Sequence, residues 1–262
     1  MRKNSINLYY VNGVDTKEKL DLIKSTGFNE YYTGIYDKNE TLTFEEQVEY
    51  AKKLGLKCSM VHCSYYEPKL DNFWLDNVDG EEVCNSYLEQ IKKCDGVSNN
   101  FVVHLNGSKN STVSEVGLNR IKKLLAECEK YNINLCIENL YSGEEIPYIF
   151  QNIKHPNLKI CFDVGHKNFL TPNFNLLQSY GKYVTVLHLH DNDGLTDQHN
   201  ICFTGTVDWN GFAKQIAEHN LILCLEVKLK DKTQYISFIN DCYSAIQKLS
   251  NLVQKHENNY NL

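Results

Sequence analysis

Six apolar, strand-like runs of this 262-residue chain end on, or just before, a histidine or a carboxylate. Such side chains are costly to bury unless they are paired or bound to a metal, so their repeated place after apolar residues requires a shared cause. The simplest cause is one metal site at one end of a barrel. The residues are His62, His104, Glu138, Asp163, His188 and Glu226.

The last four of these residues are separated by about one strand and one helix each. The intervals are 25 residues from position 138 to 163, 25 from 163 to 188 and 38 from 188 to 226. This spacing cannot place the four on one helix, but it can place them around one ring of strand ends. Three carboxylates and one imidazole suit a divalent ion such as Mn²⁺, Zn²⁺, Co²⁺ or Mg²⁺.

Each residue taken alone has a simpler explanation. A single histidine at a strand end is more often structural than a metal ligand. A single carboxylate there is more often solvated or a helix N-cap, and Asp163 shortly before Gly165 is typical of a cap. Six such residues at equivalent ends of six strands are much less expected by chance. Together they favour a metal site, although no single residue does.

A second set of polar residues follows the same strands. His166 stands three residues after Asp163, and Asp197 and His199 form a compact pair that could hold another ion or a substrate oxygen. His190 shares strand parity with His188 and could face the same cavity. As the outermost residue of its strand, however, His190 is expected only to hydrogen-bond a neighbour.

A long segment from Ser64 to Gly80 carries the aromatic residues Tyr65, Tyr66, Phe73 and Trp74. Aromatic residues in a loop over a barrel mouth can cover a substrate and exclude water. Packing against the next helix, or a dimer contact, explains them equally well. Both interpretations stay open from the sequence.

Strands and helices are predicted to alternate along the whole chain. This pattern favours a parallel sheet covered by helices, and eight repeats favour a (β/α)8 TIM barrel. The alternative is a doubly wound open sheet, which requires a phosphate-binding glycine loop near the first strand, and Tyr10 to Gly13 is not one. The predicted strands are Ile6 to Val11, Phe28 to Gly34, Lys57 to Cys63, Phe101 to Asn106, Asn134 to Leu140, Leu158 to Val164, Val184 to Asp191 and Leu221 to Lys228.

The predicted helices have plausible start and stop residues. Asp15, Thr43, Ser114 and Asp208 are candidate N-caps, and Gly27 follows a helix end as a C′ residue would. The predicted helices are Lys17 to Thr26, Thr43 to Leu54, Glu81 to Cys94, Ser114 to Tyr131, Glu144 to Ile153, Asn175 to Tyr180, Trp209 to His219 and Thr233 to Leu252.

Length and composition predict one domain over residues 1–262, with a polar tail from about Asn251. No signal h-region or membrane-spanning run is found, so cytoplasm is the expected location. The ten cysteines read as small buried thiols rather than disulfides. A net charge of −6 and only two arginines disfavour nucleic acid as the main partner without excluding it.

The motifs around these ligands resemble those of the xylose-isomerase-like, endonuclease IV-like TIM-barrel superfamily over nearly the whole chain. The resemblance is quite specific for the superfamily and less specific for an activity. The matching stretches are Ile137-Glu138-Asn139, Cys161 to His166, His188 to Gly194 with Asp197-Gln198-His199, and Leu225-Glu226-Val227.

In the sugar isomerase and epimerase branch, the resemblance implies one divalent metal bound to adjacent hydroxyl and carbonyl oxygens of the substrate. Glu138 and Glu226 would remove and return a proton through a cis-enediolate. The metal ligands would be Glu138, Asp163, His188 and Glu226. The residues expected to contact substrate are His62, His104, His166, His199 and Tyr65.

In the endonuclease IV branch, the resemblance implies three zinc ions that cleave a phosphodiester at an abasic site. Tyr65 and Tyr66 fall where that family places a DNA-intruding pair. Three departures disfavour DNA repair: Phe203 replaces an expected glycine, the loop from Thr33 to Asp37 lacks an arginine, and Leu105 to Ser108 stand where a Pro-Gly-Ser run is expected. The nine matching ligand positions are His62, His104, Glu138, Asp163, His166, His188, Asp197, His199 and Glu226.

The leading hypothesis is therefore a metal-dependent isomerase or epimerase of a small sugar or sugar phosphate. The alternative is a zinc-dependent phosphodiesterase of endonuclease IV type. A third hypothesis is a barrel that binds a sugar without turning it over, which the intact pair Glu138 and Glu226 disfavours. The expected partner is a small-molecule sugar, no membrane partner is expected, and homo-oligomerisation stays undecided.

Overall fold

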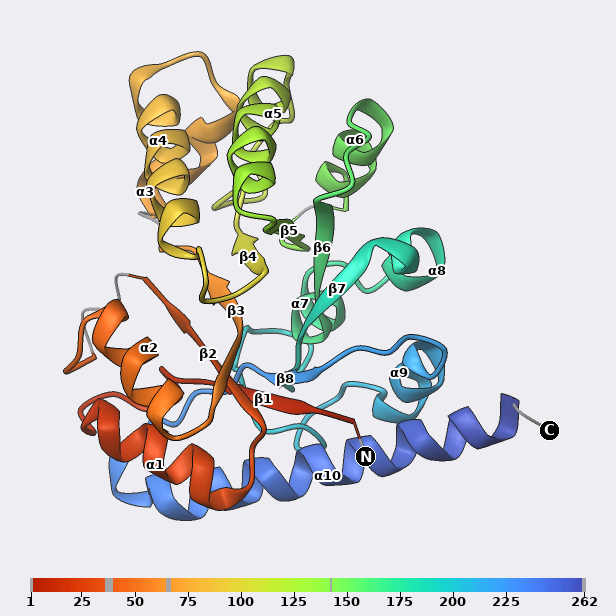
Figure 1. Ribbon diagram of the computed structural model, residues 1–262. Helices are drawn as coiled ribbons and strands as arrows, with labels where there is room; N and C mark the ends of the chain where they lie inside the picture. The colour runs from red at the N-terminus through yellow and green to blue at the C-terminus, as the bar shows by residue number, and fades with distance from the viewer. Residues whose placement is uncertain (1, 36–39, 65–66, 142, 261–262) are drawn as a thin grey trace.

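The computed structural model describes residues 2–35, 40–64, 67–141 and 143–260. Strands and helices alternate along these residues, as the sequence predicts (Figure 1). The strands are β1 Asn4–Asn7, β2 Glu30–Gly34, β3 Lys57–His62, β4 Asn100–Val103, β5 Asn134–Glu138, β6 Leu158–Asp163, β7 Val184–His188 and β8 Leu223–Leu225.

The eight strands form one parallel sheet in the order β7-β6-β5-β4-β3-β2-β1-β8. The two outer strands meet through a parallel bridge between Leu189 and Leu225, in which the Leu189 N–H donates to Cys224 O at 2.8 Å. The Glu226 N–H then donates back to Leu189 O at 3.0 Å. The sheet therefore curls into a nearly closed barrel, and the predicted (β/α)8 TIM barrel is confirmed.

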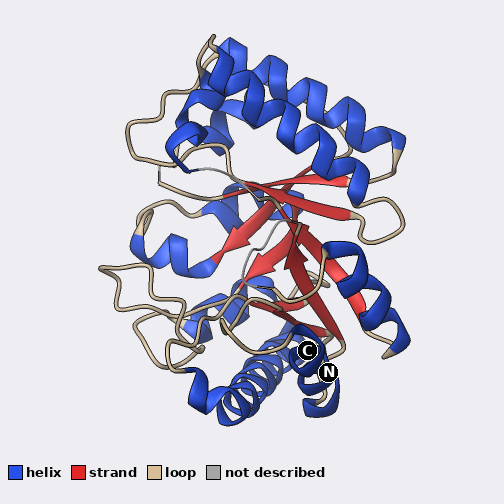
Figure 2. Ribbon diagram, turned by 90° about the vertical axis from the view of Figure 1, so that its left-hand side faces the viewer, coloured by secondary structure: helices blue, strands red, loops and turns tan. Residues whose placement is uncertain are grey.

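Helices cover the outside of the sheet, as Figures 1 and 2 show. The α-helices are α1 Thr16–Thr26, α2 Phe44–Lys53, α3 Glu67–Leu70, α4 Val78–Lys93, α5 Glu115–Lys130, α6 Glu145–Asn152, α7 Val164–Phe169, α8 Leu176–Tyr180, α9 Trp209–Ile216 and α10 Tyr235–Tyr260. Three short 3₁₀ helices are η1 Asp71–Trp74, η2 Gly181–Tyr183 and η3 Lys232–Gln234.

Local sequence explains where several helices begin and end. The side chains of Asp15, Ser114 and Asp208 accept hydrogen bonds from first-turn amides, as predicted. Thr43 and Glu46 form a reciprocal capping box at the start of α2. After α1, Gly27 adopts a left-handed φ of 111°, which only glycine adopts without strain.

The chain has two apolar clusters, one between sheet and helices and a smaller one inside the barrel. Side chains alternate along a strand, so residues two apart share a face. Every member of the inner cluster except Tyr32 precedes one of the six candidate ligands by two positions. The inner cluster therefore forms the layer beneath the candidate site. Its members are Tyr32, Met60, Val102, Cys136, Cys161, Val186 and Cys224.

The segment between β3 and α4 packs against the barrel through its described aromatic residues. Phe73 and Trp74 are buried, and Trp74 Nε1 donates to Leu105 O at 2.7 Å. The Arg120 guanidinium donates to the carbonyl oxygens of Phe73 and Leu75 at 2.7 Å each. The packing interpretation holds for these two aromatics. Tyr65 and Tyr66 lie outside the described residues.

Several element boundaries differ from the sequence-based prediction. Several strands end earlier than predicted: β4 ends at Val103 and β7 at His188, and Asp191 forms only an isolated antiparallel bridge with Asn200. Helix α7 was not predicted as a separate element, and it begins directly after β6 with Asp163 as its N-cap. The chain from Asn251, expected to be a polar tail, continues α10 to Tyr260.

Among the described residues, no helix is both long and apolar enough to cross a membrane.

Candidate metal centre

All six strand-end ligands predicted from the sequence meet at the carboxyl ends of the strands. His62, Glu138, Asp163 and His188 are the last residues of β3, β5, β6 and β7. His104 directly follows β4, and Glu226 directly follows β8. All six side chains are buried. In a parallel barrel these ends share one rim, so residues spread over more than half of the chain converge.

Four of these residues form a compact group at the floor of the site. His188 Nδ1 lies 3.2 Å from Glu138 Oε1, 3.1 Å from Glu226 Oε2 and 3.8 Å from Asp163 Oδ2. Ligand atoms of the four residues all lie within 4.8 Å of one another. This is the predicted three-carboxylate, one-imidazole arrangement.

Buried polar atoms without hydrogen-bond partners indicate that a divalent cation fits among these four side chains. Glu138 Oε1, Asp163 Oδ2 and His188 Nδ1 are buried and have no hydrogen-bond partner. Such atoms cost about 1–3 kcal/mol each when they are left unsatisfied, and a cation between them satisfies all three. The orphaned atoms are therefore the ones that a metal would bind.

The imidazole rings are oriented as metal ligands are. A carbonyl oxygen only accepts hydrogen bonds, so each Nδ1 that contacts one must carry the proton. The Nε2 atom of that ring then points toward a carboxylate of the site, which is the orientation that bound histidines show in metal sites. The pairs are His62 Nδ1 with Cys63 O at 2.9 Å, His166 Nδ1 with Asn139 O at 3.1 Å and His199 Nδ1 with Glu226 O at 3.0 Å.

The His188 ring is held at Nε2, whereas the three rings above are held at Nδ1. Its Nε2 lies 3.3 Å from the sulfur of Met60 in the inner cluster, which leaves Nδ1 to face the carboxylates. The Tyr32 ring stacks on the His188 ring, with centroids 5.5 Å apart. The layer beneath the site therefore fixes this imidazole.

Glu138 connects the central group to two further histidines. Its second oxygen, Oε2, lies 2.9 Å from His104 Nε2 and 3.4 Å from His62 Nε2. Its two oxygens thus face different sets of imidazoles. The sequence placed His62 and His104 at this rim, and the structure brings both to Glu138.

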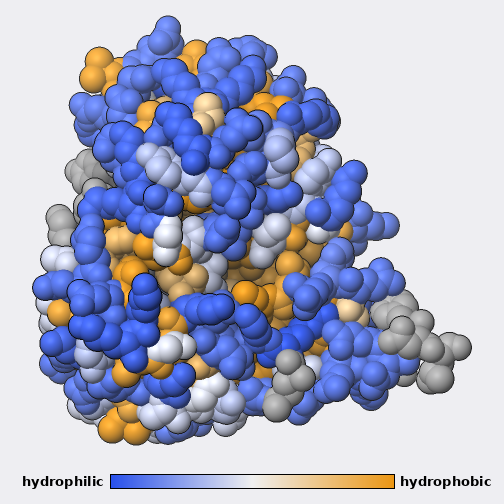
Figure 3. Space-filling view, viewed as in Figure 1, coloured by the Kyte–Doolittle hydropathy of each residue, from blue (hydrophilic) through white to orange (hydrophobic). Residues whose placement is uncertain are grey.

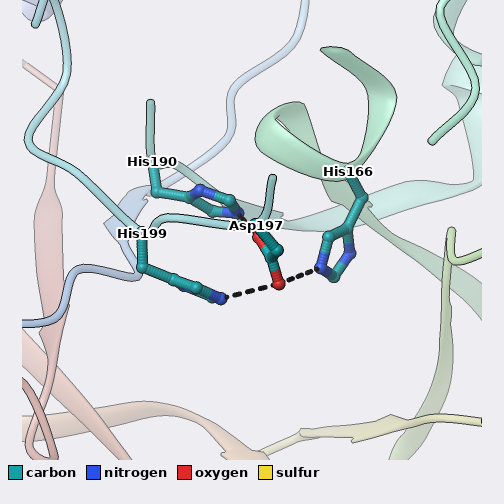
Figure 4. A group of neighbouring side chains, drawn as sticks. All are labelled: His166, His190, Asp197 and His199. Atoms are coloured by element: carbon teal, nitrogen blue, oxygen red, sulfur yellow. Dashed lines mark hydrogen bonds and ion pairs between the residues drawn. The ribbon is translucent and has the colours of Figure 1, made fainter. Parts of the chain in front are cut away.

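A second group lies beside the first, on α7 and the loop after β7 (Figure 4). Asp197 Oδ2 lies 3.4 Å from His166 Nε2 and 3.1 Å from His199 Nε2. His190 completes this group, and its ring stacks on that of His199 with centroids 4.1 Å apart. The sequence-based expectation for His190, a hydrogen bond to a neighbour, is wrong, because neither ring nitrogen has a hydrogen-bond partner.

The charges of the central group stabilise one another. Burial alone would raise the pKa of the Glu138 carboxyl, but the charges of His188 and His104 hold it well below its usual range. Burial also opposes ionisation of Glu226, and His188 again holds that pKa low. Burial lowers the pKa of His188, yet Cys161, Glu226 and Glu138 together raise it well above its ordinary value.

Two residues that support the site were not identified from the sequence. The Tyr9 hydroxyl donates to Glu226 Oε1 at 2.8 Å, and burial together with the Glu226 charge raises the pKa of Tyr9. Asn139 exchanges hydrogen bonds with the backbone of Asp163, at 2.8 Å and 2.9 Å. Asn139 stood in a quoted motif and was therefore within reach of sequence reasoning. Tyr9, which lies 217 residues from Glu226, carried no such signal.

A cavity of about 600 Å³ opens above these groups. Its floor includes Glu138 and Glu226, and His62, His104, His166 and His199 line its side. Leu140, Tyr141, Phe169 and Leu170 supply an apolar wall. Figure 3 shows the face of the molecule seen in Figure 1, which is mostly hydrophilic with apolar residues near its centre; it is not a view into this cavity. The cavity matches the size of small-molecule sites.

The fold and the site define a (β/α)8 barrel with a candidate divalent-metal centre at its strand ends. Residues 20–239 match the family model described as xylose isomerase-like TIM barrel, and the chain belongs to this family. It is similar to the uncharacterized protein MJ1614 of Methanocaldococcus jannaschii, at 26% identity over 211 residues, which is 74% of this chain and 79% of that protein.

A second relative and two solved structures add to this comparison. Protein y4fM of Sinorhizobium fredii is 28% identical over 102 residues, covering 36% of this chain and a third (33%) of y4fM. The structure of an L-ribulose 3-epimerase has a TM-score of 0.79 at 12% identity, covering 98% of this chain and 97% of that one. D-Psicose 3-epimerase from Clostridium cellulolyticum H10 has a TM-score of 0.74 at 14% identity, covering 96% and 99%. Identities this low show a shared fold.

Proposed function

We propose that this protein is a divalent-metal-dependent isomerase or epimerase of a small sugar or sugar phosphate. The observation that carries the proposal is the buried group of Glu138, Asp163, His188 and Glu226 beside a cavity of about 600 Å³, in which the first three residues have polar atoms without hydrogen-bond partners. Family membership and the sugar epimerases among the similar structures support the same class of reaction.

The four residues of the central group would hold the ion. When bound, a divalent ion there would polarise a substrate carbonyl and make the neighbouring C–H more acidic. His62 and His104 present their Nε2 atoms beside Glu138, where they can contact substrate oxygens. His166 and His199 are proposed to do the same at the other side of the cavity. Tyr65 remains a sequence-based expectation.

Glu138 and Glu226 are the proposed proton-transferring residues. Both carboxylates border the cavity and are kept ionised by their histidine neighbours, so either can accept a proton from carbon at neutral pH. Removal by one and return by the other, through a cis-enediolate, would epimerise the carbon beside a ketone or move the carbonyl. Tyr9 holds Glu226 Oε1 and so fixes the orientation of this carboxylate.

The proposal is tested by proton exchange between substrate and solvent. Protein loaded with Mn²⁺ or Co²⁺ would be incubated in D₂O with a panel of ketopentoses and ketohexoses, with and without phosphate, and deuterium at the carbon beside the ketone followed by NMR. Glu226→Gln should fold normally but lose exchange, because the amide cannot accept the proton. Glu89→Gln, an exposed change on α4, is the matched control. Full exchange in Glu226→Gln would show that the two-glutamate mechanism is wrong.

A zinc-dependent phosphodiesterase is the second candidate, and one observation favours it. Imidazoles flank the central group on both sides, with His62 and His104 at one oxygen of Glu138 and His166 and His199 around Asp197. Three ions could occupy such a set. Incision of an abasic-site duplex by the zinc-loaded protein would establish this candidate, and three bound zinc ions without incision would favour hydrolysis of a smaller phosphoester. The low arginine content and net charge of −6 disfavour a nucleic-acid substrate.

A further inference from the structure

Asn106 is a buried residue that lines the cavity and has no part in the proposed chemistry. It is 2% exposed, and its Nδ2 has no hydrogen-bond partner. A buried donor without a partner is destabilising, so each one in a folded protein requires an explanation. Asn106 stands in the stretch from Leu105 to Ser108, where the sequence departs from the Pro-Gly-Ser run expected of the endonuclease IV branch. The departure therefore adds a polar side chain to the cavity.

The chain after β4 directs the Asn106 side chain toward the barrel axis. Val102 belongs to the inner apolar cluster, and His104, two positions later, lines the cavity. Val103 and Leu105 belong instead to the larger cluster between sheet and helices. Asn106 continues this alternation on the inward side, so it lies one layer farther from the floor of the site than His104 does.

Hydrogen bonds from the segment before α4 fix the backbone on both sides of Asn106. Trp74 Nε1 donates to the carbonyl oxygen of the preceding residue at 2.7 Å. The Asp71 carboxylate accepts from the Gly107 N–H at 2.7 Å, from the Ser108 N–H at 3.1 Å and from the Ser108 hydroxyl at 2.5 Å. The backbone of this loop is therefore held in place, while no hydrogen bond holds Nδ2. A binding group on a fixed backbone loses little freedom when it contacts a ligand.

A sugar hydroxyl suits this amide better than a phosphate or a carboxylate does. An amide has a donor end and an acceptor end, and a hydroxyl can accept from the first or donate to the second. The oxygens of an ionised phosphate or carboxylate only accept, and they pair best with charged donors such as arginine. The terminal torsion of an asparagine is soft, so an amide whose Nδ2 is not held can turn toward a ligand.

We propose that Asn106 is a specificity-determining residue, whose amide donates a hydrogen bond to a hydroxyl group of the sugar away from the reacting carbon. The inference rests on the proposed function, since it takes the substrate to be a sugar in this cavity. Asn106 lies one layer above His104, so it selects among sugars without taking part in proton transfer. A sugar that lacks this hydroxyl leaves the buried donor unpaired, and a polar site rejects a deoxy analogue for this reason.

The experiment compares ketoses with their deoxy analogues in the wild-type protein and in Asn106→Leu. Protein loaded with Mn²⁺ would be assayed for kcat/KM on each ketose that it converts and on derivatives that lack one hydroxyl away from the ketone. One deoxy position should cost the wild type roughly 10- to 100-fold in kcat/KM, and Asn106→Leu should no longer distinguish that pair. Asn119→Leu, an exposed change on α5, is the matched control and should discriminate as the wild type does.

The stability of the substrate-free protein separates recognition from a structural role. A donor kept for the substrate contributes nothing to folding, so Asn106→Leu should leave the melting temperature unchanged or raise it. A fall of more than about 4 °C would show that the amide holds the fold, and it would overturn the proposal. Asn106→Ala provides the same comparisons if the larger leucine prevents folding.

Failure of this inference is distinguishable from failure of the proposed function. Conversion of ketoses with the same response to every deoxy position in wild type and Asn106→Leu would overturn the role of Asn106 alone. If no ketose is converted, the proposed function fails, and binding of the same sugar pairs would be measured by calorimetry. A deoxy penalty in affinity that disappears in Asn106→Leu would then support the inference, whereas equal affinities for every pair, or no binding, would overturn it.

Discussion

Removal of the His199 imidazole should destabilise the metal-free protein at pH 6 but much less at pH 10. Burial alone would lower the pKa of His199, but the hydrogen bond with Asp197 and the charges of Glu226, Asp197 and Asp163 raise it to about 9. Against an ordinary value near 6.5, this difference corresponds to about 3 kcal/mol. The His199 side chain is 24% exposed and that of Asp197 38%, so solvent screening reduces the expected effect to about 1–2 kcal/mol.

The sign follows from the raised pKa of the folded state. The stabilisation is fully present below pH 6.5, where the imidazole is protonated in both states, and it is lost as pH rises through about 9. The assay is urea unfolding in EDTA at pH 6 and pH 10, comparing wild type with His199→Gln and the exposed control His256→Gln. The free-energy difference between wild type and His199→Gln should shrink by about 1–2 kcal/mol between the two pH values. An equal difference at both pH values would refute the charge argument.

Three further predictions follow from the same geometry. Saturating Mn²⁺ or Zn²⁺ should raise the melting temperature of chelator-treated protein, since an ion at 100 times its Kd adds about 2.7 kcal/mol of stability. An unchanged melting temperature would count against any tight metal site. Gly117→Ala should lower the unfolding free energy by about 1–3 kcal/mol, because the new Cβ would lie 2.0 Å from the Trp74 ring. Chemical denaturation measures this change, and an unchanged midpoint would contradict the close packing of Trp74 on Gly117. Tyr9→Phe should lower kcat roughly tenfold with little change in KM, as expected for loss of one hydrogen bond to the carboxylate of Glu226, and steady-state kinetics on any accepted ketose would test it.

The central group was predictable because strand parity and strand ends are visible in the sequence. A polar residue two positions beyond a buried Cys136 or Cys161 must share the inward face, and the end of a parallel strand must lie on the common rim. Glu138 and Asp163 therefore could be placed without coordinates. The caps Asp15 and Thr43 were equally local, since each depends on amides within three residues.

The second group was only partly predictable, because its geometry depends on side chains that meet across elements. The parity of His190 with His188 allowed its ring to face the cavity, but the sequence favoured a hydrogen bond to a neighbour and does not show that both nitrogens lack such a partner. The space that Gly165 leaves for that ring becomes visible only when α7 is packed beside β7. The contact between Tyr9 and Glu226 joins opposite ends of the chain, and no local pattern encodes it.

The balance of charge in the site explains how so many ionisable groups can be buried before an ion binds. Glu138 and Glu226 both face His188, which helps to hold their pKa values low against the effect of burial, while Cys161, Glu226 and Glu138 raise the pKa of His188. The proton on His188 thus supplies positive charge that a cation supplies later. This balance of charge lets the metal-free barrel keep its ligand residues together. Because protons and cations compete for the same lone pairs, ion binding then requires proton release rather than refolding.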